Sequence, residues 1–160
     1  MEVRRANVSD IGRIKELYWE LDTDAIETQP EHFQRGERTF EYFSNIINDY
    51  KSDILLAIID NNIIGFSLLF EKEVKGLSLL VPCKYSYVQD FVITKVYRNY
   101  GFGTKLLEAS KQWAKEHGSE YLRLSVIPKN IDGIRFYKRN EMVEQMITME
   151  CPIYDNRSNS

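Results

Sequence analysis

A pair of glycines between a predicted strand and a predicted long helix constrains the fold of this chain more than any other feature. Residues 85–94 are rich in aromatic and β-branched side chains, which predicts a strand. Residues 103–117 carry apolar side chains at helical spacing and end at Gly118, which predicts a helix with a glycine C-cap. Gly101 and Gly103 allow a tight turn between the two, because neither has a Cβ. A strand that turns directly into a long helix is typical of α/β proteins.

Hydrophobic periodicity predicts the remaining elements. Polar residues with a proline predict a loop with irregular helix over 22–38, and 72–84 is predicted to be a long, partly apolar connection. We therefore expect an α/β fold with a mixed central sheet flanked by helices. In chain order, the sequence predicts strands at 2–6, 54–59, 63–71, 85–94, 121–127 and 145–151, and helices at 11–21, 40–50, 103–117 and 131–139.

Length and composition indicate one globular domain. The chain has 160 residues, 43% of them hydrophobic, which is enough for a hydrophobic core that needs no disulfide or metal ion to stabilise it. We expect one domain over residues 1–153 and a polar, frayed tail over 154–160. The net charge of −3 argues against a nucleic-acid partner, which normally needs a basic face. No apolar run approaches membrane-spanning length and the first residues do not look like a signal peptide, so no membrane partner and a cytoplasmic location are expected.

No metal site is predicted. Cys83 and Cys151 are far apart, and His32 and His117 are isolated as well. None of these residues has the spacing of a metal-ligand set.

The loop between the glycines and the long helix has the chemistry of an anion site. The first N–H groups of a helix have no intrahelical partner, and the helix adds partial positive charge there, so a diphosphate fits. Arg98 and Thr104 could add a guanidinium and a hydroxyl. The P-loop pattern is absent, and Leu106 stands where the dinucleotide fingerprint needs its third glycine. The glycines could also serve only to shape the turn.

Two spaced motifs resemble the GNAT superfamily of acetyl-CoA-dependent N-acetyltransferases. Arg98-x-x-Gly101-x-Gly103 matches the R/Q-x-x-G-x-G/A signature, and Asn130-x-x-Gly133-x-x-Phe136-Tyr137 is similar to the N-x-x-A-x-x-F-Y element. The resemblance implies a strongly twisted sheet splayed between its fourth and fifth strands, with acetyl-CoA bound in the opening. The acetyl-CoA contacts that it implies are Phe91, Val92, Ile93, Arg98, Asn99, Tyr100, Gly101, Phe102, Gly103, Thr104, Lys105, Asn130, Phe136 and Tyr137.

The same resemblance implies direct acyl transfer from a thioester to an amine. Tyr137 matches the family's acid near the coenzyme sulfur, and a phenol donates a proton without first being charged. The backbone N–H of Val92 is the expected oxyanion donor. Asp90 is the candidate base, directly or through water. The alternative is a structural role, in which its carboxylate bonds to the backbone. Phe136 and Tyr137 could also simply pack the short helix on the sheet.

The acceptor side is less constrained by the sequence. Residues after the first helix and beside Asp90 are candidates for contact with a cationic amine, although charges on a loop are often only solvated. Strand alternation predicts that Gln89 and Asp90 lie on opposite faces, and a relative of polyamine type would carry a second carboxylate here. The candidate acceptor residues are Trp19, Glu20, Asp22, Asp24 and Gln89.

Three functions remain open from sequence. The first is acetylation of a primary amine on a small molecule that is polyamine-, amino-acid- or antibiotic-like. The second is acetylation of a peptide or protein amine, and the third is an idle acyl-CoA-binding module. A homodimer is a further expectation from the resemblance. One departure from the family lies after the short helix, where 140–142 (Asn-Glu-Met) replaces Leu-Gly-Phe and Asn140 is the residue best able to take a left-handed turn.

Overall fold

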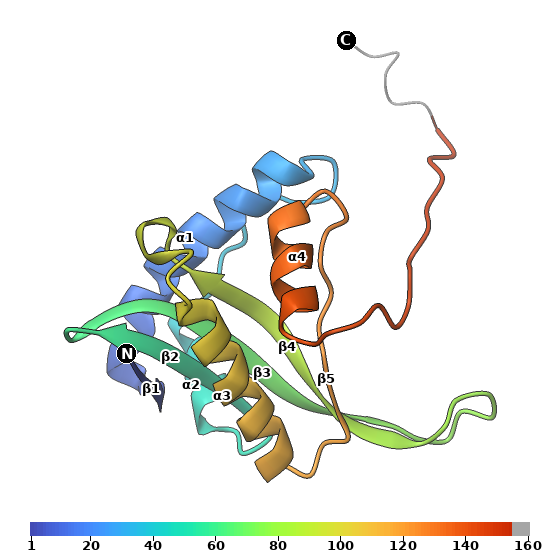
Figure 1. Cartoon of the computed structure of the whole chain (residues 1–160), viewed down its shortest axis with the longest axis horizontal. Helices are drawn as coiled ribbons and strands as arrows, with labels where there is room; N and C mark the ends of the chain where they lie inside the picture. The colour runs from blue at the N-terminus through green and yellow to red at the C-terminus, as the bar shows by residue number, and fades with distance from the viewer. Residues whose placement is uncertain (155–160) are drawn as a thin grey trace.

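A five-stranded sheet in the order β1-β2-β3-β4-β5 organises residues 1–154, the part of the chain that this computed structural model describes (Figure 1). The first four strands pair antiparallel with their neighbours, and β5 runs parallel to β4. The strands are β1 (Glu2–Arg5), β2 (Ser52–Ile59), β3 (Asn62–Val74), β4 (Cys83–Ile93) and β5 (Tyr121–Arg123).

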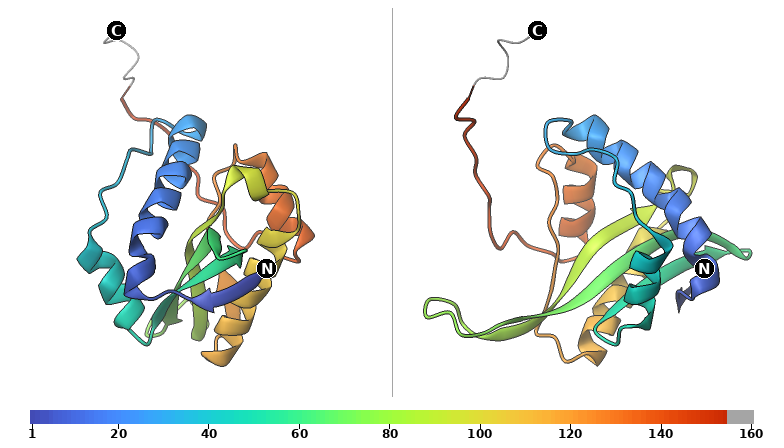
Figure 2. Two further views of the ribbon diagram at one scale, coloured as in Figure 1. Left: turned by 90° about the vertical axis from the view of Figure 1, so that its left-hand side faces the viewer. Right: turned by 180° about the vertical axis from the view of Figure 1, so that it is seen from behind.

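Helices cover both faces of this sheet. Figure 2 shows α1 and α2 on one face and α3 and α4 on the other. Each face has its own buried apolar cluster, one centred on Tyr18, Phe43 and Phe66 and the other on Leu69, Leu106 and Trp113. The helices are α1 (Ile11–Thr28), α2 (Phe40–Asn48), α3 (Phe102–Glu116) and α4 (Ile131–Arg139), with short 3-10 turns at Val8–Asp10 and Lys95–Tyr97. Within residues 1–154, no helix has both the length and the apolar character to cross a membrane.

The expected α/β architecture is confirmed, including the opening between the fourth and fifth strands. β4 and β5 pair only from Tyr85 to Tyr87 and from Tyr121 to Arg123. β4 then continues to Ile93, and no residue of 1–154 pairs with it on that side. The backbone of its last residues therefore faces an opening bounded on the far side by α4.

The prediction of a loop with irregular helix over 22–38 is corrected in its first part, where the regular helix α1 continues to Thr28. The polar residues that suggested a loop are satisfied within the helix or by neighbours. Thr23 Oγ1 donates to the backbone oxygen of Trp19 at 2.8 Å, and Thr28 Oγ1 donates to that of Asp24 at 2.6 Å. Side-chain bonds of this kind, back to the preceding turn, are compatible with a continuous helix.

The predicted connection over 72–84 is shorter than expected. β3 extends to Val74 and β4 begins at Cys83, so only residues 75–82 join them. Charged residues occupy the extended arm because it is a two-stranded ribbon exposed to solvent, visible at the lower right of Figure 1. Lys84 Nζ and Glu71 Oε1 form an ion pair across this ribbon at 2.9 Å.

The predicted last strand, 145–151, is wrong for this structure. Residues 142–154 are extended but pair with no strand among the described residues, and Figures 1 and 2 show them running past β5 at a distance from the sheet. Alternating polarity is a local property, whereas pairing requires a neighbouring edge within reach. β5 is also shorter than predicted, ending at Arg123. The expected frayed tail lies outside the described residues except for Tyr154, which is exposed.

Candidate active site

A cleft of about 280 Å³ lies where β4 separates from β5. One wall is the end of β4, with Phe91, Val92 and Ile93. The opposite wall is α4, including Phe136 and Tyr137. The floor is the loop that leads into α3, and its lining residues are Arg98, Asn99, Gly101, Gly103 and Thr104. The structure therefore brings together the two motifs, which are separated by about thirty positions in the sequence.

The loop at the start of α3 has the backbone geometry of an anion site. Gly101 is the N-cap of α3 and has φ of 82°, a left-handed conformation that favours glycine. Asn99 also has positive φ, at 66°, and asparagine is among the residues that tolerate it. Gly101, Gly103 and Thr104 line the cleft, so it borders the first turn of α3, where N–H groups lack intrahelical partners and the helix dipole adds positive potential.

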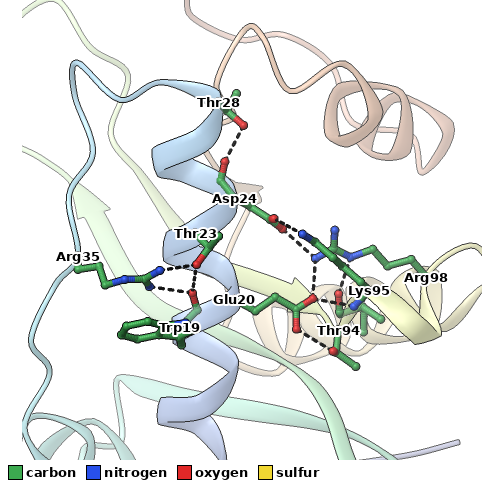
Figure 3. A network of polar contacts seen from close by, with 10 residues as sticks. Trp19, Glu20, Thr23, Asp24, Thr28, Arg35, Thr94, Lys95 and Arg98 are labelled. Atoms are coloured by element: carbon green, nitrogen blue, oxygen red, sulfur yellow. Dashed lines mark hydrogen bonds and ion pairs between the residues drawn. The ribbon is translucent and has the colours of Figure 1, made fainter.

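Two acidic side chains of α1 hold the segment that leads into this loop (Figure 3). Glu20 accepts hydrogen bonds from Thr94 Oγ1 and from the backbone N–H of Lys95, both at 2.7 Å. Asp24 forms an ion pair with Lys95 Nζ at 3.1 Å. The structure thus places both carboxylates, which sequence reasoning assigned to the acceptor, against the segment that leads into the glycine turn.

Arg98 is at the centre of the same network. Its Nη2 donates to Asp24 Oδ2 at 3.0 Å and to Glu20 Oε1 at 3.3 Å. Its Nε donates to the backbone oxygen of Ile93 at 2.7 Å. Arg98 therefore ties α1 to the end of β4, and its guanidinium is already engaged by two carboxylates. Its main structural effect is to fix the end of β4, which forms one wall of the cleft.

Aromatic side chains close the cleft against α4. Phe136 lies 5.8 Å from Phe91, measured between ring centroids, and a Cβ added at Gly103 would come within 3.2 Å of the Phe136 ring. Tyr137 meets Phe91 edge-on at 6.3 Å. The glycine at 103 therefore allows α3 and α4 to approach closely, and this approach shapes the cleft.

Burial changes the chemistry of Tyr137. It raises the pKa of the phenol to about 12, because the apolar surroundings disfavour the charged phenolate. Within the described chain the Tyr137 hydroxyl makes no hydrogen bond to another side chain or to the backbone, so its proton is available to a molecule in the cleft. The phenol therefore remains a proton donor throughout the neutral range.

Asn130 acts first as a helix cap. Its Oδ1 accepts a hydrogen bond from the backbone N–H of Gly133 at 2.9 Å, at the start of α4. A Cβ at Gly133 would come within 2.5 Å of the Asn130 side chain. The glycine at 133 therefore leaves room for the Asn130 side chain in its capping position.

A β-bulge in β4 shapes the acceptor side. Leu68 is opposite Asp90 and Leu69 is opposite Val88, so Gln89 is an extra residue without a partner on β3. The bulge breaks the alternation, and the prediction that Gln89 and Asp90 lie on opposite faces was wrong. Both side chains face the α1 and α2 side of the sheet, where Asp90 meets a tyrosine of α1 and Gln89 meets Tyr42 of α2.

Asp90 is paired with Tyr18 in this half-buried position. The Tyr18 hydroxyl donates to Asp90 Oδ2 at 2.6 Å. Burial raises the pKa of the Asp90 carboxyl above its ordinary range, while the hydrogen bond from Tyr18 and the charge of Arg38 oppose the rise. The pKa of the Tyr18 phenol is also raised, chiefly by burial and then by the neighbouring carboxylate. Tyr18 is therefore the proton donor of the pair.

A second cavity, of about 310 Å³, lies on the outer side of α1. Tyr18, Trp19 and Asp22 line it from the helix, and Arg35 and Arg38 line it from the following loop. The Arg38 guanidinium lies 3.9 Å above the Tyr18 ring and donates to both oxygens of Asp22, at 2.9 and 3.1 Å. The Arg35 guanidinium lies 3.4 Å above the Trp19 ring.

The predicted site residues therefore fall into distinct groups. Asp24 lines the cleft, Trp19 and Asp22 line the second cavity, and Glu20, Gln89 and Asp90 line neither. Lys105 and Tyr100 are exposed beside the loop. Sequence reasoning did not assign a role to Tyr18, Arg38 or Tyr42. No local pattern marks them, because Tyr18 and Tyr42 have their partners on β4, about fifty to seventy positions away, and Arg38 has its partners on α1. Among residues 1–154 no cluster of three or more potential metal ligands occurs.

Comparison with known proteins agrees with this geometry. Residues 13–141 match the family model described as the acetyltransferase (GNAT) family. An uncharacterised N-acetyltransferase from Archaeoglobus fulgidus is 24% identical over 142 residues, which cover 89% of this chain and 92% of the relative. Relatives at this identity indicate common ancestry and leave the acceptor open.

Solved structures share the fold. A tetramutant of a Bacillus halodurans protein superposes with a TM-score of 0.89 at 23% identity, covering 96% of this chain and all of that one. An aminoglycoside acetyltransferase from an uncultured soil sample, solved with sisomicin, superposes with a TM-score of 0.69 at 16% identity, covering 96% of each chain. The family match spans most of the chain and includes both motifs that line the cleft, so this chain belongs to the acetyltransferase (GNAT) family and is an acetyl-CoA-dependent N-acetyltransferase.

Proposed function

We propose that this enzyme transfers an acetyl group from acetyl-CoA directly to the primary amine of a small molecule. The observation that carries the proposal is the cleft itself, which has free helix-end N–H groups at one end and the Tyr137 phenol at the other. Residues 1–153 act as one catalytic domain in this proposal. The chain spans nearly the whole Archaeoglobus fulgidus relative, which supports that division.

Acetyl-CoA is proposed to enter between β4 and α4. Phe91, Val92 and Ile93 present a strand edge without a partner there, and an extended molecule can pair with such an edge. The diphosphate is assigned to the turn from Asn99 to Thr104, where left-handed residues bring backbone N–H groups close together. We also assign the side chains of Phe102, Lys105 and Asn130, with those next to the turn, to the border of the acetyl-CoA path.

The chain's own residues are proposed to move two protons. The amine gives up a proton to the Asp90 carboxylate through the Tyr18 hydroxyl or water, and the amine nitrogen then forms a bond to the thioester carbon. The backbone N–H of Val92 stabilises the oxygen that gains charge. As the carbon–sulfur bond breaks, Tyr137 donates its proton to the departing sulfur.

A small, polar acceptor is supported by the second cavity. Trp19, Asp22 and Arg35 form a wall that combines an exposed aromatic ring with charges of both signs. An aminoglycoside acetyltransferase of similar fold was solved with sisomicin, so the proposed acceptors include an antibiotic-like amine. Amino acids and polyamines are the other members of the proposed class. A polyamine-type relative is expected to carry two carboxylates at positions 89 and 90, whereas this chain has only that of Asp90.

The test measures CoA release from acetyl-CoA with a panel of amines. The panel contains aminoglycosides, polyamines, amino acids and short peptides, and wild type is compared with Tyr137→Phe. We expect turnover with one small-amine class and a loss in kcat of about 100-fold or more in the variant, because a proton donor is removed. Tyr121→Phe is the matched control, since that tyrosine is exposed on β5 and outside the cleft.

Three outcomes would contradict parts of the proposal. Turnover only with peptides would replace the small-molecule acceptor by a protein amine. Acetyl-CoA binding without turnover on any amine would favour an idle binding module. Equal rates for Tyr137→Phe and wild type would remove Tyr137 as the acid while leaving the enzyme intact.

The proposal includes a setting and an assembly. We place the reaction in the cytoplasm, where thiols such as Cys83 and Cys151 stay reduced, since both are free in the structure. A homodimer is part of the proposal, and nucleic acid and membranes are not proposed partners. Acetyl-CoA is the acyl donor, and no metal is assigned a role.

A further inference from the structure

Arg35, in the loop after α1, is a cation that is held in place by neutral groups. Its Nη1 donates to the backbone oxygen of Trp19 at 3.0 Å, and its Nη2 donates to Thr23 Oγ1 at 2.6 Å. The guanidinium also lies 3.4 Å above the Trp19 ring. Figure 3 shows Arg35 on the opposite side of α1 from Arg98, whose guanidinium is paired with two carboxylates. Among residues 1–154, no carboxylate neutralises the charge of Arg35 in this way.

Most of the hydrogen-bonding capacity of this guanidinium remains unused within the described chain. An arginine side chain has five N–H donors in a rigid, planar fork, and only one hydrogen on each Nη of Arg35 is engaged. The Trp19 side chain is 64% exposed, so the stacked pair can be reached from solvent. Stacking and the two hydrogen bonds fix the fork before any ligand arrives, which lowers the entropy lost when an anion binds to it.

The second cavity has an excess of positive charge once its internal ion pair is taken into account. Three basic and two acidic residues line it, namely Lys15, Arg35, Arg38, Asp22 and Glu37. Asp22 is neutralised by Arg38, which donates to both of its oxygens. The remaining charges are Lys15 and Arg35 against Glu37. A ligand with several positive charges would therefore meet like charge here, whereas a ligand with an anionic group would meet opposite charge.

The same cavity adjoins the candidate base. The ring of Tyr18 lines the cavity, and its hydroxyl donates to Asp90 Oδ2 at 2.6 Å. Trp19, which carries the stacked guanidinium, is the next residue of α1. A small molecule in this cavity can therefore contact the tyrosine that meets the base and the free arginine at the same time.

We propose that the acceptor amine also carries an anionic oxygen group, and that Arg35 binds this group in the second cavity. The inference rests on the proposed transfer to a small amine and narrows the acceptor to amines that bear a carboxylate or a phosphate-type group. A planar guanidinium fork matches either group with paired hydrogen bonds. Polyamines and aminoglycosides, which carry several positive charges and no anion, are disfavoured by the same cavity.

The experiment compares the binding of amines that differ only in the anionic group. Calorimetry on the full chain with CoA present gives dissociation constants for the protein amino acids and for their carboxamides. Aminoalkylphosphonates test the phosphate-type group, and spermidine and sisomicin represent the polycations. We expect the best acid or phosphonate to bind about tenfold or more tightly than the matched amide, because hydrogen bonds between charged groups are lost in the amide. Both polycations should bind more weakly than this ligand.

Arg35→Gln should remove the preference for the anionic member of each pair. The ratio of the two dissociation constants should fall to within about threefold, since the guanidinium is absent. Arg35→Lys keeps the charge without the planar fork and should retain only part of the preference. Arg13→Gln is the matched control, because Arg13 also belongs to α1 and lines neither cavity. Unchanged acetyl-CoA affinity and circular dichroism in all three variants separate loss of the anion site from loss of folding.

Four results would overturn the inference. They are equal binding of acids and amides by the wild type, a preference that survives in Arg35→Gln, tighter binding of spermidine or sisomicin than of every acid and phosphonate, and no binding of any anionic amine. A preference confined to acids or to phosphonates identifies which group Arg35 binds. Binding of an anionic amine without its acetylation would contradict the proposed function and leave the anion site in place, because these readouts do not depend on turnover.

Discussion

Asp90 shows how the fold alters the chemistry of a single residue. Its carboxyl is half-buried, accepts a hydrogen bond from Tyr18 and has a pKa above its ordinary value of 3.8. It is therefore protonated at low pH and becomes a base only as the pH rises through the raised pKa. The same pKa shift lowers the stability of the protein as the pH rises. Because the folded state disfavours ionisation of Asp90, the contribution of this residue to the free energy of unfolding falls as the pH rises through the same range.

Asp90→Asn should remove the acidic limb of the pH–rate profile. If Asp90 is the base, the rate of the wild type rises with pH through its raised pKa, and an amide has no such ionisation. We expect kcat to fall by about 100-fold and the remaining activity to lose its dependence on pH over this range. The measurement is kcat from about pH 5 to about pH 9 with saturating acetyl-CoA.

Two variants serve as controls for this profile. Tyr18→Phe removes the hydrogen bond that opposes the rise in the Asp90 pKa, so the acidic limb should move to higher pH. Asp60→Asn lies in the β2–β3 turn and should leave the profile unchanged. A wild-type limb that persists in Asp90→Asn would assign the base to another group.

Glu141→Gly should stabilise the protein. Glu141 has φ of 67°, a left-handed conformation that glycine adopts without a Cβ penalty. We expect the free energy of unfolding to rise by about 1 kcal/mol, measured by thermal or urea denaturation. Glu141→Ala keeps the Cβ and removes the charge, so it should not share this gain. Equal stability of the alanine and glycine variants would attribute the effect to charge.

At the scale of elements, the cleft depends on how α3 and α4 meet. Gly103 in the first turn of α3 packs against Phe136 of α4, and Phe136 in turn packs against Phe91 of β4. The elements α3, α4 and β4 therefore come together at Gly103, which has no side chain. α1 adds a fourth constraint, because Glu20 and Asp24 hold Arg98 and the segment before the loop.

Gly103→Val should disrupt acetyl-CoA binding while the fold survives. A Cβ at this position already comes within 3.2 Å of Phe136, and the branched methyl groups of valine would also occupy the start of α3. We expect the acetyl-CoA dissociation constant to rise by at least about tenfold, measured by calorimetry. Gly12→Val is the control, because a Cβ there meets nothing within 4 Å. Unchanged affinity in Gly103→Val would remove the loop as the acetyl-CoA site.

At the scale of the whole molecule, burial is unevenly distributed. β2 and β3 hold many of the fully buried side chains, including Ile54, Leu56, Phe66 and Leu68. β5 and α4 have none. The cleft therefore lies between strands with many fully buried side chains and an element, α4, that has none. Regions with little buried apolar surface are the first to open in native proteins.

Hydrogen exchange should show this division and its response to the donor. Amides of β2 and β3 should exchange slowest, and those of α4 faster. Acetyl-CoA, bound between β4 and α4, should slow exchange in α4 and in residues 99–104 by about tenfold, since binding stabilises only the closed form. α2 lies on the opposite face and is the internal control. An equal effect on α2 would indicate general stabilisation and no specific contact with α4.

The sequence by itself determined the elements whose cause is local. The strand at 85–94, the glycine turn, the long helix and the capped short helix follow from periodicity, conformational freedom at Gly101 and the motifs of the family. The opening between the fourth and fifth strands came from the resemblance, because no local pattern describes it. The extension of α1 to Thr28 was predicted only as irregular helix, because a run of polar residues is compatible with both a helix and a loop.

Only the tertiary structure decided the polar contacts and the final segment. The bulge at Gln89 depends on its pairing with β3, and it turns Asp90 toward Tyr18. The ion pairs of Arg98 join residues more than seventy positions apart. The sequence over 145–151 predicts a strand, but these residues pair with no strand among the described residues, because pairing requires an edge within reach. Side-chain period is a property of a few neighbouring residues, whereas pairing, burial and pKa depend on what the rest of the chain brings close.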